Sequence, residues 1–148
     1  GAIITLNAGS SSIKFSVYGA NARVEKPNLV GKATFASGRT RIAIECGGKQ
    51  PAPADIASAD FDVVVGEVLG ALKRYASSSD ILAVGHRIVH GGTRFAEPQI
   101  MTPEVVAELA RLTPLAPQHQ PYGLRIAAAA REEWPTAIQV AAFDTAFH

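Results

Sequence analysis

The chain has 148 residues, of which 47% are hydrophobic and 18% are charged, so it is long enough for one domain with a buried core and is not a disordered chain. Its formal net charge is +1 and its 14 lysines and arginines are scattered, without the basic stripe that binding to DNA or RNA requires. Cys46 is the only cysteine and no apolar run reaches membrane-spanning length, which excludes intrachain disulfides, cysteine-based zinc sites and membrane helices and makes a cytoplasmic location the expectation.

Two strands joined by a tight turn are predicted at the start of the chain. Residues 2–6 are apolar and largely β-branched, and Ile13, Phe15 and Val17 alternate with polar residues, as is typical of strands. The segment between them, residues 7–12, is polar and contains a glycine. It therefore predicts the turn of a hairpin.

This turn also suits a phosphate group. Gly9 lets the backbone approach an anion closely, Lys14 adds a positive charge on a long side chain, and Asn7 offers an amide oxygen to a metal-bound water. An ordinary hairpin turn rich in serine and glycine accounts for the same residues equally well, so both interpretations stay open at this point. The loop amides and three hydroxyls are the candidate donors to phosphate oxygens, and the hydroxyls belong to Ser10, Ser11 and Ser12.

Further antiparallel strands and then a helix are predicted next. Short β-type stretches lie at residues 29–30 and 41–45, and residues 51–58 are rich in Pro, Ala, Asp and Ser, which predicts a loop. Apolar residues at spacings of three and four predict a helix over residues 61–75, with acidic residues early and basic residues late, as the helix dipole favours. The serine run 77–79 is expected to end this helix, whose apolar face consists of Phe61, Val64, Val65, Val68, Leu69, Leu72 and Tyr75.

The rest of the chain alternates strands and helices, which shifts the predicted fold class to α/β. Apolar, β-branched runs predict strands, and a threonine cap followed by a first-turn proline predicts the start of a helix. The predicted elements are a buried strand at residues 81–84, a helix that Thr102 caps and Pro103 opens, a helix from Pro121 to Glu133, and a strand at residues 138–143 that carries Asp144 at its carboxyl end.

A second cluster of polar and glycine residues, residues 85–95, follows the strand predicted at residues 81–84. Arg87 presents a planar fork of donors that suits a carboxylate or a phosphoryl group, at the strand end where open α/β sheets bind ligands. A surface ion pair explains Arg94 better. Arg87 is therefore the candidate clamp for an anionic substrate.

The histidines of this cluster do not predict a metal site. His86 and His90 are four residues apart, but the glutamate of the H-E-x-x-H zinc helix is missing and two glycines follow. Val89, between them, fits a core position or, beside a ligand, part of a small apolar wall.

Asp144 is the third candidate site residue. A carboxylate at the tip of a buried strand suits a magnesium ion or its waters, and a helix cap is the ordinary alternative. The phosphate-suited turn, the arginine clamp and this aspartate together are the parts that phosphoryl transfer needs. The P-loop pattern G-x-x-x-x-G-K-[ST] is absent, so another architecture would have to hold the nucleotide.

Four segments together resemble the acetokinase family, the acetate kinases of the actin-like superfamily of sugar kinases and chaperone ATPases. They are residues 7–14, 86–95, 143–148 and, more weakly, 117–121. The resemblance implies a ribonuclease-H-like α/β fold, with a mixed sheet that starts with an antiparallel hairpin and has flanking helices, and two such domains per subunit. It also implies Mg²⁺, ATP or ADP as co-substrate, reversible phosphoryl transfer from ATP to acetate to give acetyl phosphate, and a homodimer.

The resemblance also implies roles for individual residues. A literal base role for Asp144 is doubtful on chemical grounds, because a carboxylate acceptor with a pKa of about 4 is already ionised near neutral pH, and positioning magnesium suits it better. The implied catalytic residues are Asp144 and Arg87, and the implied substrate-binding residues are Arg87, Val89 and His119, with Val89 lining the pocket for the acyl methyl group. The implied nucleotide-phosphate contacts are Lys14, Ser10, Ser11 and Ser12, and the implied magnesium-associated residue is Asn7.

One motif departs from the family pattern. Where the family usually has Pro-Leu-His-Asn-Pro, this chain has Gln118 and Gln120 in residues 117–121, so a polar residue replaces an apolar pocket residue. Burying the Gln118 amide without a partner would cost a few kcal/mol. Gln118 is therefore expected to form local hydrogen bonds or to turn away from the pocket.

The matching segments cover only the amino-terminal part of the family. Residues 1–148 are therefore expected to be an amino-terminal domain, without the nucleotide-binding carboxyl-terminal domain, and to be folded but inactive alone. Two alternatives stay open: a propionate or butyrate kinase, and a noncatalytic module that binds a phosphate or a carboxylate.

Overall fold

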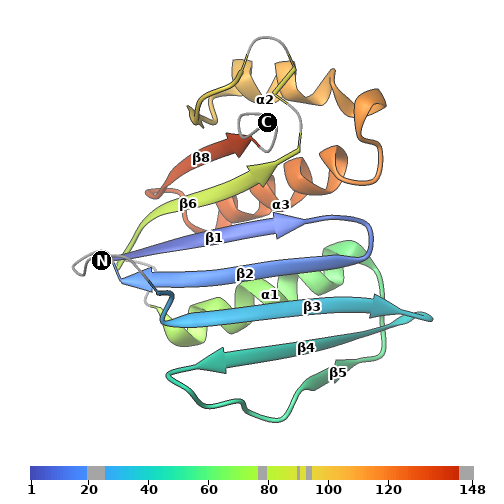
Figure 1. Ribbon diagram of the computed structural model, residues 1–148, viewed down its shortest axis with the longest axis vertical. Helices are drawn as coiled ribbons and strands as arrows, with labels where there is room; N and C mark the ends of the chain where they lie inside the picture. The colour runs from blue at the N-terminus through green and yellow to red at the C-terminus, as the bar shows by residue number, and fades with distance from the viewer. Residues whose placement is uncertain (20–25, 77–79, 90, 93–94, 144–148) are drawn as a thin grey trace.

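The computed structural model describes residues 1–19, 26–76, 80–89, 91–92 and 95–143. An eight-stranded sheet runs through it in the order β5-β4-β3-β2-β1-β6-β8-β7 (Figure 1). The strands are β1 Ala2–Ala8, β2 Ser12–Gly19, β3 Leu29–Ala36, β4 Arg39–Cys46, β5 Ala54–Ile56, β6 Ile81–Ile88, β7 Gln99–Ile100 and β8 Ile138–Phe143. The helices are α1 Phe61–Tyr75, α2 Pro103–Ala110 and α3 Gln120–Glu133, with a short 3₁₀ turn, η2, at Thr113–Leu115.

The sheet is mixed. β1 to β5 pair antiparallel in chain order, whereas β6 and β8 run parallel to β1 and β7 is antiparallel to β8. The parallel strands need long return connections, which α1 provides before β6 and α2 with α3 provide before β8. The hairpin start, the antiparallel strands and the ribonuclease-H-like α/β class are thus as predicted.

Local sequence explains where the first two helices begin. The Asp60 side chain accepts a hydrogen bond from the Val63 amide at the start of α1, and Thr102 caps α2 in the same way at Val105. The apolar face predicted for α1 is buried except at Tyr75, which is 45% exposed at the last residue of the helix. The serine run 77–79, expected to end α1, lies outside the described residues.

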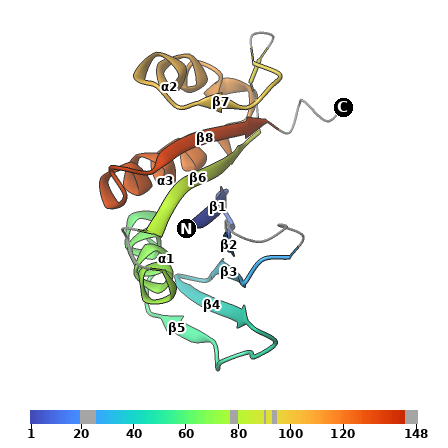
Figure 2. The ribbon, with the colours of Figure 1, turned by 90° about the vertical axis from the view of Figure 1, so that its left-hand side faces the viewer.

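The helices lie on one side of the sheet. In Figure 2 the sheet is seen near its edge, with α1 and α3 against the same face and α2 beyond the β7–β8 side. A large apolar cluster fills the space between α1, α3 and the antiparallel strands, and a second cluster joins α2 and α3 to β6 and β8. The opposite face of the sheet carries no helix among the described residues.

Several strands are longer than predicted, and two strands were not predicted: β1 continues into the predicted turn to Ala8, and β3 and β4 extend beyond residues 29–30 and 41–45. β6 continues to Ile88, four residues past its predicted end, because pairing with β1 on one side and β8 on the other extends it. β5 lies within the predicted loop 51–58, and β7 was not predicted. Both are short edge strands that only their neighbours in the sheet define.

In the described part of the chain, no helix is long and apolar enough to cross a membrane.

Candidate functional site

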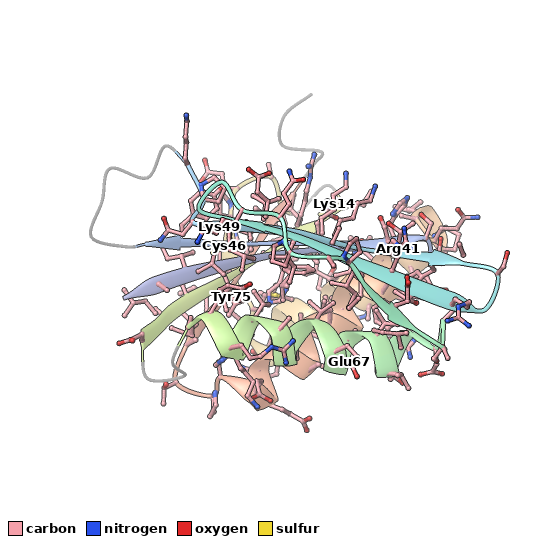
Figure 3. The ribbon with its side chains drawn as sticks, turned by 90° about the horizontal axis from the view of Figure 1, so that it is seen from below. Lys14, Arg41, Cys46, Lys49, Glu67 and Tyr75 are labelled. Carbon is pink, nitrogen blue, oxygen red and sulfur yellow. The ribbon has the colours of Figure 1, made fainter. Side chains whose placement is uncertain are left out.

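The face of the sheet opposite α1 and α3 carries several predicted site residues. Side chains alternate between the faces along a strand, so Ile4, Leu6 and Ile13 are buried under the helices, while Asn7 and Lys14 lie on the other side. Lys14 projects away from α1 (Figure 3). We call this surface the open face.

The register of the strands aligns polar side chains across the open face. Lys32 on β3 pairs with Lys14 on β2, and Lys14 pairs with Asn7 on β1. Leu6 pairs with His86 in the parallel strands β1 and β6. The next residues of the two strands, Asn7 on β1 and Arg87 on β6, therefore lie side by side. Side chains of directly paired residues lie on the same face. The result, which we call the cationic row, is Lys32, Lys14, Asn7 and Arg87.

A hollow of ≈ 890 Å³ lies over the open face and includes the whole cationic row in its lining. Beside the row, the Thr5 and Ser16 hydroxyls are hydrogen-bonded to each other across β1 and β2. Gly85 pairs with Thr5 and leaves room above it because it has no side chain. The residues that line this hollow include three cations and, among those described, no aspartate or glutamate. The hollow is therefore suited to an anionic ligand.

The serine turn is less open to phosphate than its sequence suggested. The Gly9 amide donates to the Ser12 carbonyl at 2.9 Å, and the Ser10 amide donates to the Gln118 carbonyl at 3.0 Å. Two of the loop amides predicted to bind phosphate are thus already engaged. The Ser10 and Ser11 side chains are exposed, and Ser12 lies on the open face, two residues before Lys14 in β2.

His119 packs against this turn. A Cβ atom added to Gly9 would lie 3.0 Å from the His119 Nδ1 atom, so the glycine makes room for the imidazole ring. The Gln118 side chain is exposed, as expected for a glutamine without a buried partner. Gln120, by contrast, is fully buried and donates from Nε2 to the Leu109 carbonyl at 2.9 Å, which ties α3 to α2.

Comparison with known proteins identifies the family. The model of the acetokinase family matches residues 2–148. The chain belongs to the acetokinase family. It is 37% identical over 157 residues to the acetate kinase of Methylocella silvestris, an alignment that covers 99% of this chain and 39% of that protein.

Solved structures of relatives have the same fold. The Porphyromonas gingivalis acetate kinase superposes with a TM-score of 0.86 at 30% identity, over 99% of this chain and 38% of that one. A propionate kinase from Francisella tularensis gives 0.82 at 26% identity, over 100% of this chain and 38% of that one. The chain thus spans well under half the length of the acetokinase relatives it matches.

The remaining residues that the acetokinase resemblance implicates are not all in the hollow. Val89 directly follows β6 and is half-buried, outside the residues that line the hollow. His119 lies at the serine turn and is likewise outside the lining. Asp144, His90 and Arg94 lie outside the described residues. The structure therefore brings together Asn7, Lys14 and Arg87, and adds Lys32, Thr5 and Ser16, which the sequence analysis did not single out.

A magnesium ion alone does not fit the described part of this hollow. The side-chain oxygens of its lining residues are the Asn7 amide oxygen, the Tyr18 hydroxyl and the paired hydroxyls of Thr5 and Ser16, beside three cations that would repel a divalent cation. No group of three or more histidine, cysteine, aspartate or glutamate side chains suited to a metal occurs among the described residues. A hard cation prefers carboxylate and phosphate oxygens. The site therefore fits an anion, or a metal that arrives bound to one.

His86 lies on the helix-covered side, next to Arg87 in the chain. It is 1% exposed, and its Nε2 donates to the Gln139 Oε1 at 2.6 Å, while Nδ1 and the Gln139 Nε2 atom have no hydrogen-bond partner among the described residues. Burial lowers the pKa of His86, and the hydrogen bond to Gln139 opposes this shift only in part. The imidazole is therefore neutral near pH 7 in the folded protein. It has a structural role on the helix-covered side of β6, the strand that also carries Arg87.

The free energy of unfolding is expected to decrease as pH falls below about 6.5, because there the unfolded chain binds a proton at His86 that the folded chain does not. This single group contributes up to about 1.4 kcal/mol per pH unit, between its unfolded pKa and its lower folded pKa. Urea unfolding of the wild type and of His86→Gln between pH 5 and about 7.5 measures it. The two proteins should differ in pH dependence, and parallel curves would contradict the assignment.

Proposed function

We propose that this chain forms the anion-binding part of a kinase that transfers a phosphoryl group reversibly between ATP and acetate, giving acetyl phosphate and ADP. Membership of the acetokinase family supports a carboxylate kinase with ATP as co-substrate. The observation that carries the proposal is the cationic row over a hollow whose described lining has no carboxylate. Such a hollow can hold a carboxylate acceptor and a nucleotide polyphosphate together.

In this proposal Arg87 contacts the acceptor carboxylate and the phosphoryl group in transfer. Its planar guanidinium donates two parallel hydrogen bonds, which orient a carboxylate oxygen for in-line attack. Lys14 and the hydroxyls of Ser10, Ser11 and Ser12 contact the nucleotide phosphates. The acceptor is already ionised near neutral pH, so the protein needs to supply position and positive charge more than a base.

Magnesium would enter this site with the nucleotide phosphates. Asn7 lies between Lys14 and Arg87 in the cationic row, where its amide oxygen can face the ion or one of its waters. We propose Asp144, which follows β8, as the carboxylate partner of that ion. When bound, the ion would neutralise charge on the phosphoryl oxygens.

Acetate is the proposed acceptor among short carboxylic acids. The relatives named above include acetate kinases and one propionate kinase. We propose that Val89 and His119 line the acyl pocket. Since the Gln118 side chain is exposed, its polarity is not an obstacle to an apolar acyl group. Propionate and butyrate are the rivals that the activity assay must compare.

A noncatalytic module is the second candidate function. The same cationic row would bind a phosphate or carboxylate without any transfer, and the chain spans 39% of the Methylocella silvestris enzyme. We propose that residues 1–148 are one domain of the kinase and do not catalyse transfer alone.

Trapping acyl phosphate with hydroxylamine tests these proposals. The 148-residue chain and the product of the same gene read to its natural stop codon are incubated with Mg-ATP and formate, acetate, propionate or butyrate. Hydroxamate is expected only from the gene product, and most with acetate. A higher rate with propionate would make propionate, not acetate, the acceptor. Turnover by the 148-residue chain would refute the proposal that it is inactive alone. If neither protein forms hydroxamate, the noncatalytic module is favoured.

A further inference from the structure

Lys32 extends the cationic row one strand beyond the predicted phosphate residues. It pairs directly with Lys14 across β2 and β3, so the two ammonium groups rise from adjacent strands on the same face. Lys32 also lines the hollow that contains Lys14, Asn7 and Arg87. Adjacent strands are about 4.8 Å apart, so the row reaches about 14 Å from Lys32 to Arg87. A single phosphoryl group does not span that length.

Like charges directly opposite each other destabilise a sheet unless an opposite charge lies between them. Neither Lys14 nor Lys32 forms an ion pair with any residue in the described ranges. Two carboxylates lie on the same face further out. Asp55 is engaged with Arg41 at 3.0 Å, and Glu45 pairs with Val30, one diagonal step from Lys32. The two lysines therefore lack a counter-charge between them in the described structure.

We propose that Lys32 is a further anion-binding residue and, with Lys14, forms a two-lysine clamp for a polyphosphate chain. This inference rests on the proposed function, in which the nucleotide phosphates extend from Arg87 past Lys14. The end of the row at Lys32 then takes the phosphoryl groups furthest from the acceptor. An ordinary surface lysine does not explain this arrangement, because Lys32 lies directly opposite a second lysine, Lys14, and both line the same hollow.

Isothermal titration calorimetry of the 148-residue chain with inorganic tripolyphosphate and with orthophosphate tests the clamp. For Lys32→Ala, the dissociation constant of tripolyphosphate is expected to rise by about threefold to tenfold, the range for losing one solvent-exposed charged contact. The dissociation constant of orthophosphate should change less than about twofold, because a short anion can bind between Lys14 and Arg87.

Lys49→Ala is the matched control for the lost charge. Lys49, which Figure 3 labels, is exposed and follows β4. It is not among the residues that line the hollow. Its replacement should leave both dissociation constants nearly unchanged. Glu45→Gln should tighten tripolyphosphate binding slightly, because it removes the negative charge that lies one diagonal step from Lys32.

Three results would overturn the clamp: no binding of tripolyphosphate to the wild-type chain, equal losses for both anions in Lys32→Ala, or equal effects of Lys32→Ala and Lys49→Ala. The experiment requires no turnover. A Lys32 effect would therefore survive failure of the acyl phosphate assay, and an unchanged Lys32→Ala beside an active gene product would remove only the clamp.

Discussion

Replacing Arg87 by alanine is expected to lower acyl phosphate formation by the complete gene product by about 10²- to 10³-fold, the usual loss when one donor to a developing charge is removed. Arg87 lies in the cationic row beside Asn7 and lines the hollow over the open face. Its loss would leave the acceptor carboxylate without its orienting contact. Initial rates of hydroxamate formation at saturating acetate and ATP measure the effect.

Two variants sharpen this test. Arg87→Lys keeps the charge but not the planar fork, so it should recover little of the lost rate if two parallel hydrogen bonds orient the acceptor. Arg74→Ala removes an exposed arginine from α1, on the helix side of the sheet, and should keep the wild-type rate. Equal thermal midpoints for all the variants show that folding is intact. Near-normal transfer by Arg87→Ala would contradict the proposed mechanism, and weakened anion binding without any wild-type transfer would favour the module.

Replacing Gly31 by alanine is expected to destabilise the fold by about 2 to 3 kcal/mol, the cost of overpacking a filled core. Gly31 lies in the middle of β3, opposite Phe15 on β2. A Cβ atom at this position would lie 2.2 Å from the Phe15 ring, which is 2% exposed and belongs to the larger core cluster. The ring cannot move without displacing its neighbours. Urea unfolding of the 148-residue chain measures the loss.

A double-mutant cycle identifies the cause. In a Phe15→Leu background the added methyl group meets a smaller side chain, so Gly31→Ala should cost clearly less than in the wild type. Gly66→Ala is the matched control, because Gly66 is exposed in the middle of α1 with no heavy atom within 4 Å of an added Cβ. It should stabilise the protein by about 0.5 to 1 kcal/mol. Equal costs of Gly31→Ala in both backgrounds would exclude the clash with the ring.

The first hairpin and the helices were predictable from sequence because their signals are local. A continuous apolar, β-branched run predicts β1, alternation of apolar residues predicts β2, and apolar spacing predicts α1. β5 and the last four residues of β6 were not predictable in this way. The end of β6 pairs with β8, a strand far along the chain, and β5 is a three-residue edge strand that only its pairing with β4 defines, so no pattern within the segments themselves reveals them.

Some residues of the candidate site were predictable from sequence, and others became apparent only from the fold. The residue types of Asn7, Lys14 and Arg87 are enough to predict an anion site. That Gly9 faces His119, and that Lys32 belongs to the row, followed only from the fold. Insertion of β1 between an antiparallel and a parallel neighbour is what aligns residues from four strands on one face. Local sequence determines the strands and helices with strong apolar patterns and which of their residues are polar, but pairing between strands, driven by burial of their apolar faces under α1 and α3, decides which polar side chains meet.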